Sequence, residues 1–218
     1  MPLKFSPLIL LCTFALSTSA NPGQQAFDSY FQSLRVFWGE IYPEGGRTLY
    51  CNQIFGSRKG RSINVEHVYP MAWAMKAEKC DNRDQCRRVS PRFNRMEADL
   101  HNLYPARMDI NKVRGSFPFG SVRGEAREFG NCDFELDYRQ RRVEPRPTAR
   151  GNIARAMFYM HLTYDLKIFK KQGKLLQRWN RDDPPDAEER RRNRLIAAIQ
   201  GNSNPFIDDP GKADKLRF

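Results

Sequence analysis

The stretch that decides the fold is Ile63-Asn64-Val65-Glu66-His67-Val68-Tyr69-Pro70 (residues 63–70). It predicts a short strand that Pro70 ends. Two chemically active side chains, Glu66 and His67, stand next to each other near the end of this strand. Neighbouring strand residues point to opposite faces, but the turn of the backbone at a strand end allows both to reach one site. An adjacent glutamate and histidine has little meaning alone, so the surrounding sequence must decide its role.

The sequence before this strand predicts a helix and a second strand. Residues 27–37 place apolar side chains at helical spacing, and Pro43 and the glycines after it end the pattern. Residues 49–51 predict a second strand, which pairs with the strand beginning at Ile63 around a turn at residues 56–61. The early part of the chain is therefore expected to hold the strands.

The sequence after Pro70 is mainly helical in pattern. A short helix after Met71 is followed by a loop that runs through residue 88, and residues 120–142 are rich in turns with one possible strand. The last helix has clear boundaries, because Asp183 caps it, Pro184-Pro185 open it and Gly201 stops it. Helices are expected at residues 94–103 (stopped by Pro105), 106–113 (capped by Gly115), 150–171, 175–179 and 184–200.

The first twenty residues predict a secretory leader. Lys4 provides the positive start, residues 5–16 are apolar, and Thr18-Ser19-Ala20 offers a cleavage site. The apolar run is shorter than the roughly 20 residues needed to span a bilayer. A lipoprotein with Cys12 as the acylated residue is disfavoured, because Leu11 is too bulky for the preceding position. We expect a signal peptide at residues 1–20 and one domain at residues 21–218, with no later membrane segment.

Removal of this leader leaves four cysteines, and an even number in an exported chain indicates disulfide bonds. Three pairings are possible. The short spacing of Cys80 and Cys86 favours a local bridge, and Cys51 would then pair with Cys132 across a long loop. A four-cysteine zinc site is the rival interpretation, but the chain has no C-x-x-C pair.

The mature chain is strongly basic, and most of the excess is arginine. The formal net charge of +12 becomes +11 without the leader, because the leader holds Lys4 and no acidic residue. Guanidinium groups match phosphate, and a basic surface attracts polyanions without reading their sequence. Anionic lipid and cell-wall polymers are also possible partners. Charge alone therefore favours nucleic acid only modestly.

The chain also offers oxygen ligands for a hard cation. Glu66 has a carboxylate and Asn111 an amide carbonyl, which suit Mg²⁺ or Ca²⁺ that keep several waters. His67 would then remain free to take a proton from water. A set so poor in sulfur and imidazole argues against zinc.

Four segments together resemble bacterial periplasmic endonuclease I, the family of secreted Vibrio-type nucleases. They are INVEHVYP (63–70), MEADLHNLYPA (96–106), INKVRG (110–115) and ARGNIARAMFYM (149–160), in the order and spacing of the family. The similarity covers most of the mature chain, and four coordinated motifs are far more specific than one.

The resemblance implies an α+β fold with a ββα-metal (His-Me finger) core in a mostly helical, disulfide-stapled single domain. By position, His67 is the general base, Glu66 and Asn111 hold one Mg²⁺ (with Ca²⁺ or Mn²⁺ as substitutes), and Arg83, inside the Cys80–Cys86 loop, holds the phosphate. Supporting positions are Glu97, His101 and Asn102, and a structural role is favoured for His101. The arginines expected to bind the nucleic-acid backbone are Arg92, Arg95, Arg114, Arg150 and Arg155.

Two features depart from the family. Its members carry more cysteines than the four that remain here, and some have a glutamate where this chain has Asn64. These differences put in doubt the full disulfide pattern and a second acidic residue acting on His67.

The expected activity is sequence-nonspecific, Mg²⁺-dependent endonuclease cleavage to 5′-phosphate products. The expected partners are double- and single-stranded DNA and RNA, and we expect a monomer in the periplasm or outside the cell. Two alternatives remain open: an exported basic DNA-binding protein without catalysis, and a nuclease specialised for RNA. A peptidoglycan-binding module is a distant third.

Overall fold

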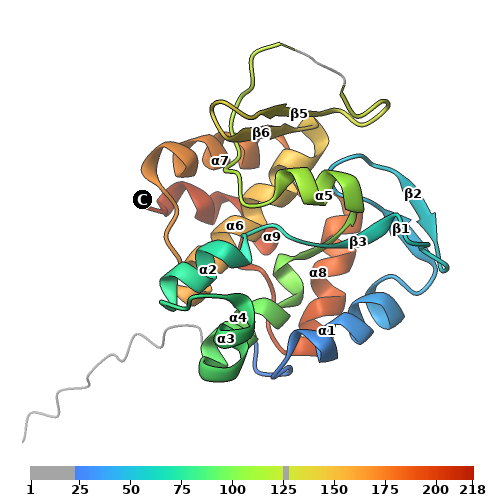
Figure 1. Ribbon diagram of the computed structural model, residues 1–218, viewed down its shortest axis with the longest axis vertical. Coiled ribbons are helices and arrows are strands. Elements are labelled where there is room, and N and C mark those ends of the chain that lie inside the picture. Colours follow the sequence, from blue (N-terminus) through green and yellow to red (C-terminus); the bar gives the residue numbers. More distant parts are fainter. Residues whose placement is uncertain (1–22, 125–127) are drawn as a thin grey trace, which may run out of the picture.

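The stretch 63–70 forms the central strand of a two-strand-and-helix unit. In the computed structural model, which describes residues 23–124 and 128–218, β3 (Ile63–His67) pairs antiparallel with β4 (Leu103–Arg107). Helix α5 (Met108–Arg114) follows β4 directly and packs against both strands (Figure 1). This is the ββα unit expected from the sequence. The predicted leader, residues 1–20, lies outside the described residues.

Strand β4 was not predicted. We expected a helix up to residue 103 and helical turns from residue 106, but α4 (Pro91–Ala98) ends earlier and a 3₁₀ turn (Leu100–Asn102) leads into β4. Pro105 lies within the strand, opposite Val65, and its carbonyl oxygen accepts a hydrogen bond from the backbone N–H of Leu49 at 2.8 Å. Because the described part of this sheet has only two strands, a proline without an N–H is tolerated there.

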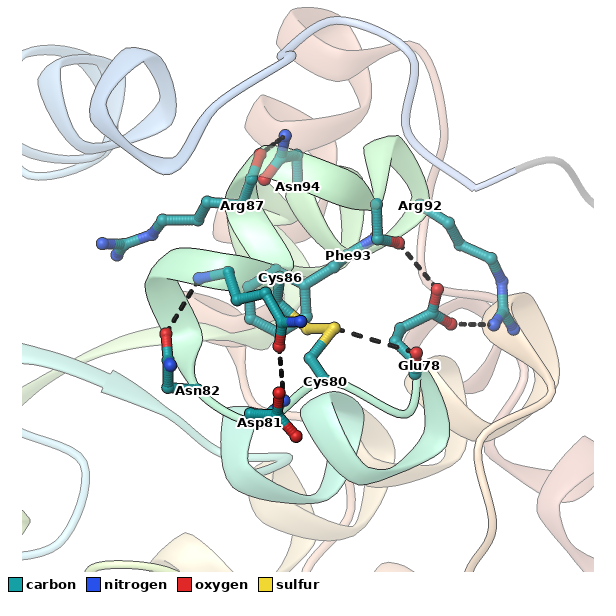
Figure 2. The surroundings of a disulfide bond; sticks show 11 residues. Glu78, Cys80, Asp81, Asn82, Cys86, Arg87, Arg92, Phe93 and Asn94 are labelled. Carbon is teal, nitrogen blue, oxygen red and sulfur yellow. Dashed lines mark hydrogen bonds and ion pairs between the residues drawn. A yellow bond between two sulfur atoms is a disulfide. The ribbon is translucent and has the colours of Figure 1, made fainter.

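The segment between β3 and β4 is mostly helical, including residues 83–88 of the region expected to be a loop. Helix α2 (Met71–Ala77) is followed by α3 (Arg83–Val89), so Arg83 and Cys86 lie in a helix. The side chain of Asn82 starts α3 by accepting a hydrogen bond from the backbone N–H of Gln85 at 2.9 Å (Figure 2). The expectation of a loop was therefore wrong for residues 83–88, where the Asn82 cap starts a helix, and only residues 78–82 of that region lack helical structure.

The N-terminal part begins with the predicted helix. Helix α1 (Tyr30–Val36) continues as a wider π-helical turn (Phe37–Ile41), and β1 (Gly45–Arg47) pairs with β2 (Ile54–Gly56). Residues 49–51 form a turn and not a strand. The left-handed backbone of Asn52 (φ 54°), whose N–H bonds to the carbonyl oxygen of Thr48 at 2.9 Å, reverses the chain at this point.

From residue 128 onward, the chain forms a hairpin and four α-helices. The prediction of one helix over residues 150–171 was wrong, because Asp165 has a left-handed backbone (φ 49°) that ends α6. The side chain of Asp186, not Asp183, caps α8; Asp183 instead accepts a hydrogen bond from the backbone N–H of Gly151 at 2.8 Å. The elements are β5 (Phe134–Asp137), β6 (Arg142–Pro145), α6 (Arg150–Tyr164), α7 (Lys170–Asp182), α8 (Ala187–Gln200) and α9 (Pro205–Asp208). Because β5 and β6 follow Pro70, the strands are not confined to the early part of the chain.

Both predicted disulfide bonds are present: Cys51 is bonded to Cys132, and Cys80 to Cys86. With all four cysteines paired, the zinc alternative is excluded. Helix α6 supplies much of the core, where Ile153, Met157 and Met160 are buried. Over residues 23–124 and 128–218, we find no helix that combines the length and apolarity needed to cross a bilayer.

Candidate active site

A cleft of about 640 Å³ opens beside the end of β3 and brings the four central predicted residues together. Glu66 and His67 come from β3, Arg83 from the first turn of α3, and Asn111 from α5. These three elements are far apart in the sequence. The pairing of β3 with β4 places α5 beside the glutamate and the histidine.

His67 is fixed as a neutral base. Its Nε2 lies 2.9 Å from the backbone carbonyl oxygen of Glu97. A carbonyl oxygen can only accept, so Nε2 carries the hydrogen and Nδ1 has the free lone pair. Burial, together with the positive charge of Arg83, lowers the pKa of His67 to about 4. The imidazole is therefore neutral at pH 7 and can accept a proton at Nδ1.

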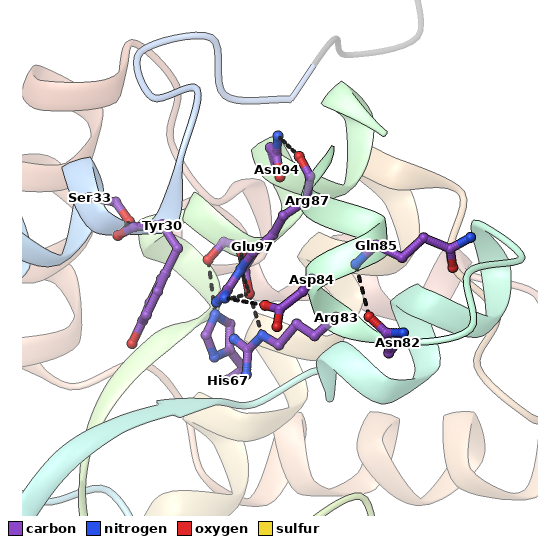
Figure 3. Close-up of polar contacts among 10 residues, drawn as sticks. All are labelled: Tyr30, Ser33, His67, Asn82, Arg83, Asp84, Gln85, Arg87, Asn94 and Glu97. Carbon is purple, nitrogen blue, oxygen red and sulfur yellow. Dashed lines mark hydrogen bonds and ion pairs between the residues drawn. The ribbon is translucent and has the colours of Figure 1, made fainter. Parts of the chain in front are cut away.

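Glu97 connects this base to two arginines. Its buried carboxylate forms ion pairs with Nε of Arg83 and, at 2.9 Å, with Nε of Arg87 (Figure 3). Burial acts to raise the pKa of Glu97, but the hydrogen bonds from Arg87 and the charge of Arg83 outweigh it and lower the pKa. The ion pair uses Nε of Arg83, and the Arg83 side chain is 40% exposed. Its terminal amino groups are thus available to an anion in the cleft.

Tyr30 packs against the same group and was not predicted. Its ring centroid lies 5.1 Å from that of His67 and 5.8 Å from the guanidinium carbon of Arg83. The ring comes from α1, lies beside the imidazole and covers part of it (Figure 3). A lone tyrosine in an amphipathic helix gives no sequence signal for this role. Arg87 did give one, because it lies four residues after Arg83 and shares its helix face.

Glu66 is a buried carboxylate with one oxygen occupied. Its Oε1 accepts a hydrogen bond from the Tyr50 hydroxyl at 2.7 Å and pairs with the Arg114 guanidinium at 2.9 Å. Within the described residues, Oε2 accepts no hydrogen bond. Burial raises the pKa of Glu66, although Arg114 and Tyr50 act in the opposite direction. A cation at Oε2 would favour the charged form.

Asn111 presents the matching neutral oxygen. Its Nδ2 donates to Oδ1 of Asn64 and to the carbonyl oxygen of Val65, both at 3.0 Å. Both amide hydrogens are thus used, and the carbonyl Oδ1 is left for a ligand. Asn64 thereby orients the amide of Asn111.

These two oxygens fit a hard divalent cation. Among residues 23–124 and 128–218, no group of three His, Cys, Asp or Glu side chains is arranged to hold a metal. One carboxylate oxygen and one amide oxygen are a sparse set, which suits Mg²⁺ because it retains several waters.

The three predicted supporting residues have different positions. Glu97 lies at the site, as described above. Asn102 holds the backbone of Tyr69, two residues after His67, through its Oδ1 (2.7 Å) and its Nδ2 (3.1 Å). His101 faces elsewhere: its Nε2 lies 2.9 Å from the carbonyl oxygen of Asn202. The favoured structural role of His101 agrees with this contact.

The arginines expected to bind the nucleic-acid backbone require a correction. Arg114 is buried and holds the main chain after β3 through the carbonyl oxygens of His67 (3.2 Å) and Val68, besides its pair with Glu66. Arg155 is also fully buried, in an ion pair with Glu189. Neither can contact a polyanion in this fold, so the prediction was wrong for both.

The other three arginines remain predictions. The Arg92 side chain is partly exposed and pairs with Glu78, and that of Arg150 pairs with Glu144 at 2.8 Å. Arg95 is half-buried.

Comparisons with known proteins agree with this geometry. The sequence profile of the Endonuclease I family matches residues 36–211. An extracellular deoxyribonuclease of Aeromonas hydrophila is 34% identical over 94% of this chain and 98% of its own length. A periplasmic deoxyribonuclease of the same species is 38% identical over 93% of this chain and 94% of its own length. An extracellular ribonuclease of Bacillus amyloliquefaciens is 34% identical over 54% of this chain and 46% of its own length. With its ββα unit, its cleft residues and this match over most of its length, the chain belongs to the Endonuclease I family.

Proposed function

We propose that the protein is a sequence-nonspecific endonuclease that hydrolyses phosphodiester bonds of DNA and RNA to 5′-phosphate products. The observation that carries this proposal is the cleft itself. A neutral histidine with a free Nδ1, two unengaged oxygens and an arginine with free amino groups line one cavity. The names of the deoxyribonuclease and ribonuclease relatives support nucleic-acid substrates.

The reaction begins with water in line with a backbone phosphorus. Nδ1 of His67 takes a proton from this water while its oxygen forms a bond to phosphorus, and the bond to the 3′ oxygen breaks. The terminal amino groups of Arg83 donate hydrogen bonds to a nonbridging oxygen as negative charge develops. Because the bond to the 3′ oxygen breaks, one product keeps a 5′ phosphate and the other ends in a 3′ hydroxyl.

Glu66 and Asn111 would hold one Mg²⁺, with Ca²⁺ or Mn²⁺ as substitutes. A bound Mg²⁺ would stabilise the negative charge that develops during cleavage and would acidify water, the proton source for the leaving 3′ oxygen. Arg114 and Tyr50 fix Oε1 of Glu66, and Asn64 turns the amide of Asn111, so both ligands are oriented in advance.

The absence of sequence preference follows from the contacts. Arg83, Arg92, Arg95 and Arg150 can contact phosphate, which is the same in every nucleotide. We further propose a monomer that acts in the periplasm or outside the cell after removal of residues 1–20. The extracellular and periplasmic relatives support this location.

One assay tests the proposal and separates the alternatives. Purified mature protein is incubated with supercoiled DNA and with RNA, with Mg²⁺ and with EDTA. We expect both substrates to be cut with Mg²⁺ and neither to be cut with EDTA. Binding without cleavage would favour the catalytically inactive DNA-binding protein, and cleavage of RNA alone would favour the RNA-specialised nuclease.

A further inference from the structure

A second cavity, of about 330 Å³, lies where the segment after α5 meets β6 and α7. We propose that this cavity, the α7 pocket, binds one nucleotide unit of a nucleic-acid strand, with the base inside and the phosphate at the rim. The residues that line it include Phe119, Arg142, Phe169, Lys171, Gln172 and Arg178. The inference rests on the proposed nuclease function and adds a contact for the same substrate.

The interior of the α7 pocket is aromatic and apolar. Phe119 forms a buried wall, and Phe169, which immediately precedes α7, is 59% exposed. An exposed aromatic ring beside an apolar cavity is the arrangement on which single-stranded bases stack, whatever their identity.

Gln172 gives the pocket a polar group without a partner. Its side chain is only 6% exposed, and neither Oε1 nor Nε2 has a hydrogen-bond partner within the described part of the chain. Such a buried amide is costly unless something satisfies it. Because an amide both donates and accepts, a rotation of the Gln172 side chain toward the cavity would let it pair with the edge of a nucleobase.

The rim has a single sign of charge. Arg142, Lys171 and Arg178 line it, and no carboxylate is found among its described lining residues. A cavity of about 470 Å³ near α8 provides the contrast, because Asp186, Glu188 and Glu189 line it beside its arginines. Of these two cavities, the α7 pocket is the one whose charge suits a phosphate.

The chain places the α7 pocket close to the catalytic cleft. Ser116 lines the cleft and Pro118 lines the pocket, so roughly 7 Å of backbone at most separates the two linings. The ring of Phe119 also lies 4.7 Å from the guanidinium carbon of Arg114, which pairs with Glu66. A strand with its phosphate at His67 can therefore place a nearby nucleotide in the pocket.

Binding measured in EDTA tests the pocket independently of cleavage. The probe is a fluorescent twelve-nucleotide DNA single strand, titrated with wild-type protein, Phe169→Ala and Gln172→Leu. We expect Phe169→Ala to raise the Kd about five- to tenfold, the scale of one lost base stack, and Gln172→Leu to raise it severalfold. Leu162→Ala, which removes an exposed apolar side chain outside the pocket, should leave the Kd unchanged. Values within twofold of wild type for both pocket variants would overturn the inference.

Two further binding measurements identify the ligand. Arg178→Ala should lower the slope of log Kd against log salt by about one phosphate contact. Free deoxyadenosine 5′-monophosphate separates a nucleotide within a strand from a free nucleotide. If the pocket variants weaken its binding but not that of the strand, the strand assignment is overturned.

Gln172→Leu replaces an unsatisfied amide and Phe169 is exposed, so both proteins should fold, which thermal melting checks. A wild-type protein that binds the strand through this pocket but does not cleave it would contradict the proposed function alone.

Discussion

Nε2 of His67 lies 2.9 Å from the backbone carbonyl oxygen of Glu97, while the carboxylate of the same glutamate holds Arg83 and Arg87. One residue at the end of α4 therefore orients both the proposed base and the arginine proposed to bind phosphate. Its main chain sets the tautomer of the histidine, and its side chain sets the position of the guanidinium. The relative placement of the proposed proton acceptor and the proposed phosphate ligand thus depends on the packing of α3 against α4 and on the bond between α4 and the end of β3.

Replacement of the base should separate binding from cleavage. We expect His67→Ala to bind DNA as wild type does but to cleave it roughly 10²- to 10⁴-fold more slowly, the usual contribution of a positioned general base. Initial rates of plasmid nicking measure the effect. His161→Gln is the control, because this histidine contacts the carbonyl oxygen of Leu166 outside the cleft. Undiminished cleavage by His67→Ala would remove the assignment.

The pH dependence of cleavage should reflect the lowered pKa of His67. Only the neutral imidazole can accept a proton, and its pKa of about 4 keeps it neutral well below the ordinary value of 6.5. The acidic limb of kcat/KM should therefore fall near pH 4 and not near pH 6.5.

Tyr30 provides the matched comparison for this limb. Tyr30→Ala lets water reach the imidazole, so the limb should move upward in pH, whereas Tyr30→Phe keeps the ring and should keep the wild-type profile. Identical profiles for the alanine variant and wild type would contradict a role of the ring in excluding water.

The sequence was sufficient to predict the ββα core, the two disulfides and the four residues that share the cleft, because these depend on a resemblance spread over several segments. It was insufficient where one local signal opposed another. Pro105 indicated the end of a helix, but its pairing with β3 and its bond to Leu49 are long-range contacts that no local pattern contains.

The arginines show the same limit in their electrostatics. Arg83, Arg114 and Arg155 are chemically identical in the sequence, yet one faces the cleft and two are buried against carboxylates. A partner such as Glu189, contributed by a distant helix, decides which arginine is available to substrate, and only the fold reveals it.

Metal binding should depend on both proposed ligands. We expect Mg²⁺ affinity, measured by calorimetry, to fall at least tenfold in Glu66→Gln and in Asn111→Ala, because each removes one of two protein oxygens. High Mg²⁺ should partly restore cleavage by Asn111→Ala. Glu40→Gln, at an exposed position, is the charge-matched control. Cleavage that continues in EDTA would contradict the metal-dependent mechanism.

The two disulfides should differ in what their loss affects. Cys51–Cys132 closes a separation of 81 residues and Cys80–Cys86 one of 6, so loop entropy predicts losses of about 4–5 and about 2 kcal/mol respectively on replacement by serine pairs. The shorter bridge ties α3 to the loop that follows α2 (Figure 2). Arg83 is the first residue of α3. We therefore expect the Cys80/Cys86 serine pair to reduce cleavage at a temperature where it is fully folded.

Urea unfolding and plasmid nicking separate these two effects. The Cys51/Cys132 serine pair serves as the comparison, because it should lose more stability and, when folded, retain more activity per molecule. Wild-type rates from a folded Cys80/Cys86 variant would show that this bridge has no role in placing Arg83.

Replacement of the buried Arg155 and replacement of the half-buried Arg95 should affect different properties. Arg155→Met leaves the Glu189 carboxylate buried without its ion-pair partner, so the free energy of unfolding should fall by about 3–5 kcal/mol. Its folded form should keep the wild-type slope of log Kd against log salt for DNA, because no phosphate contact is lost. Arg95→Met should show the opposite pattern, with nearly unchanged stability and a slope lower by about one phosphate contact. Urea unfolding and salt-dependent fluorescence anisotropy measure the two quantities. A stable Arg155→Met protein with a reduced slope would mean that Arg155 reaches the nucleic acid, which its burial in this fold excludes.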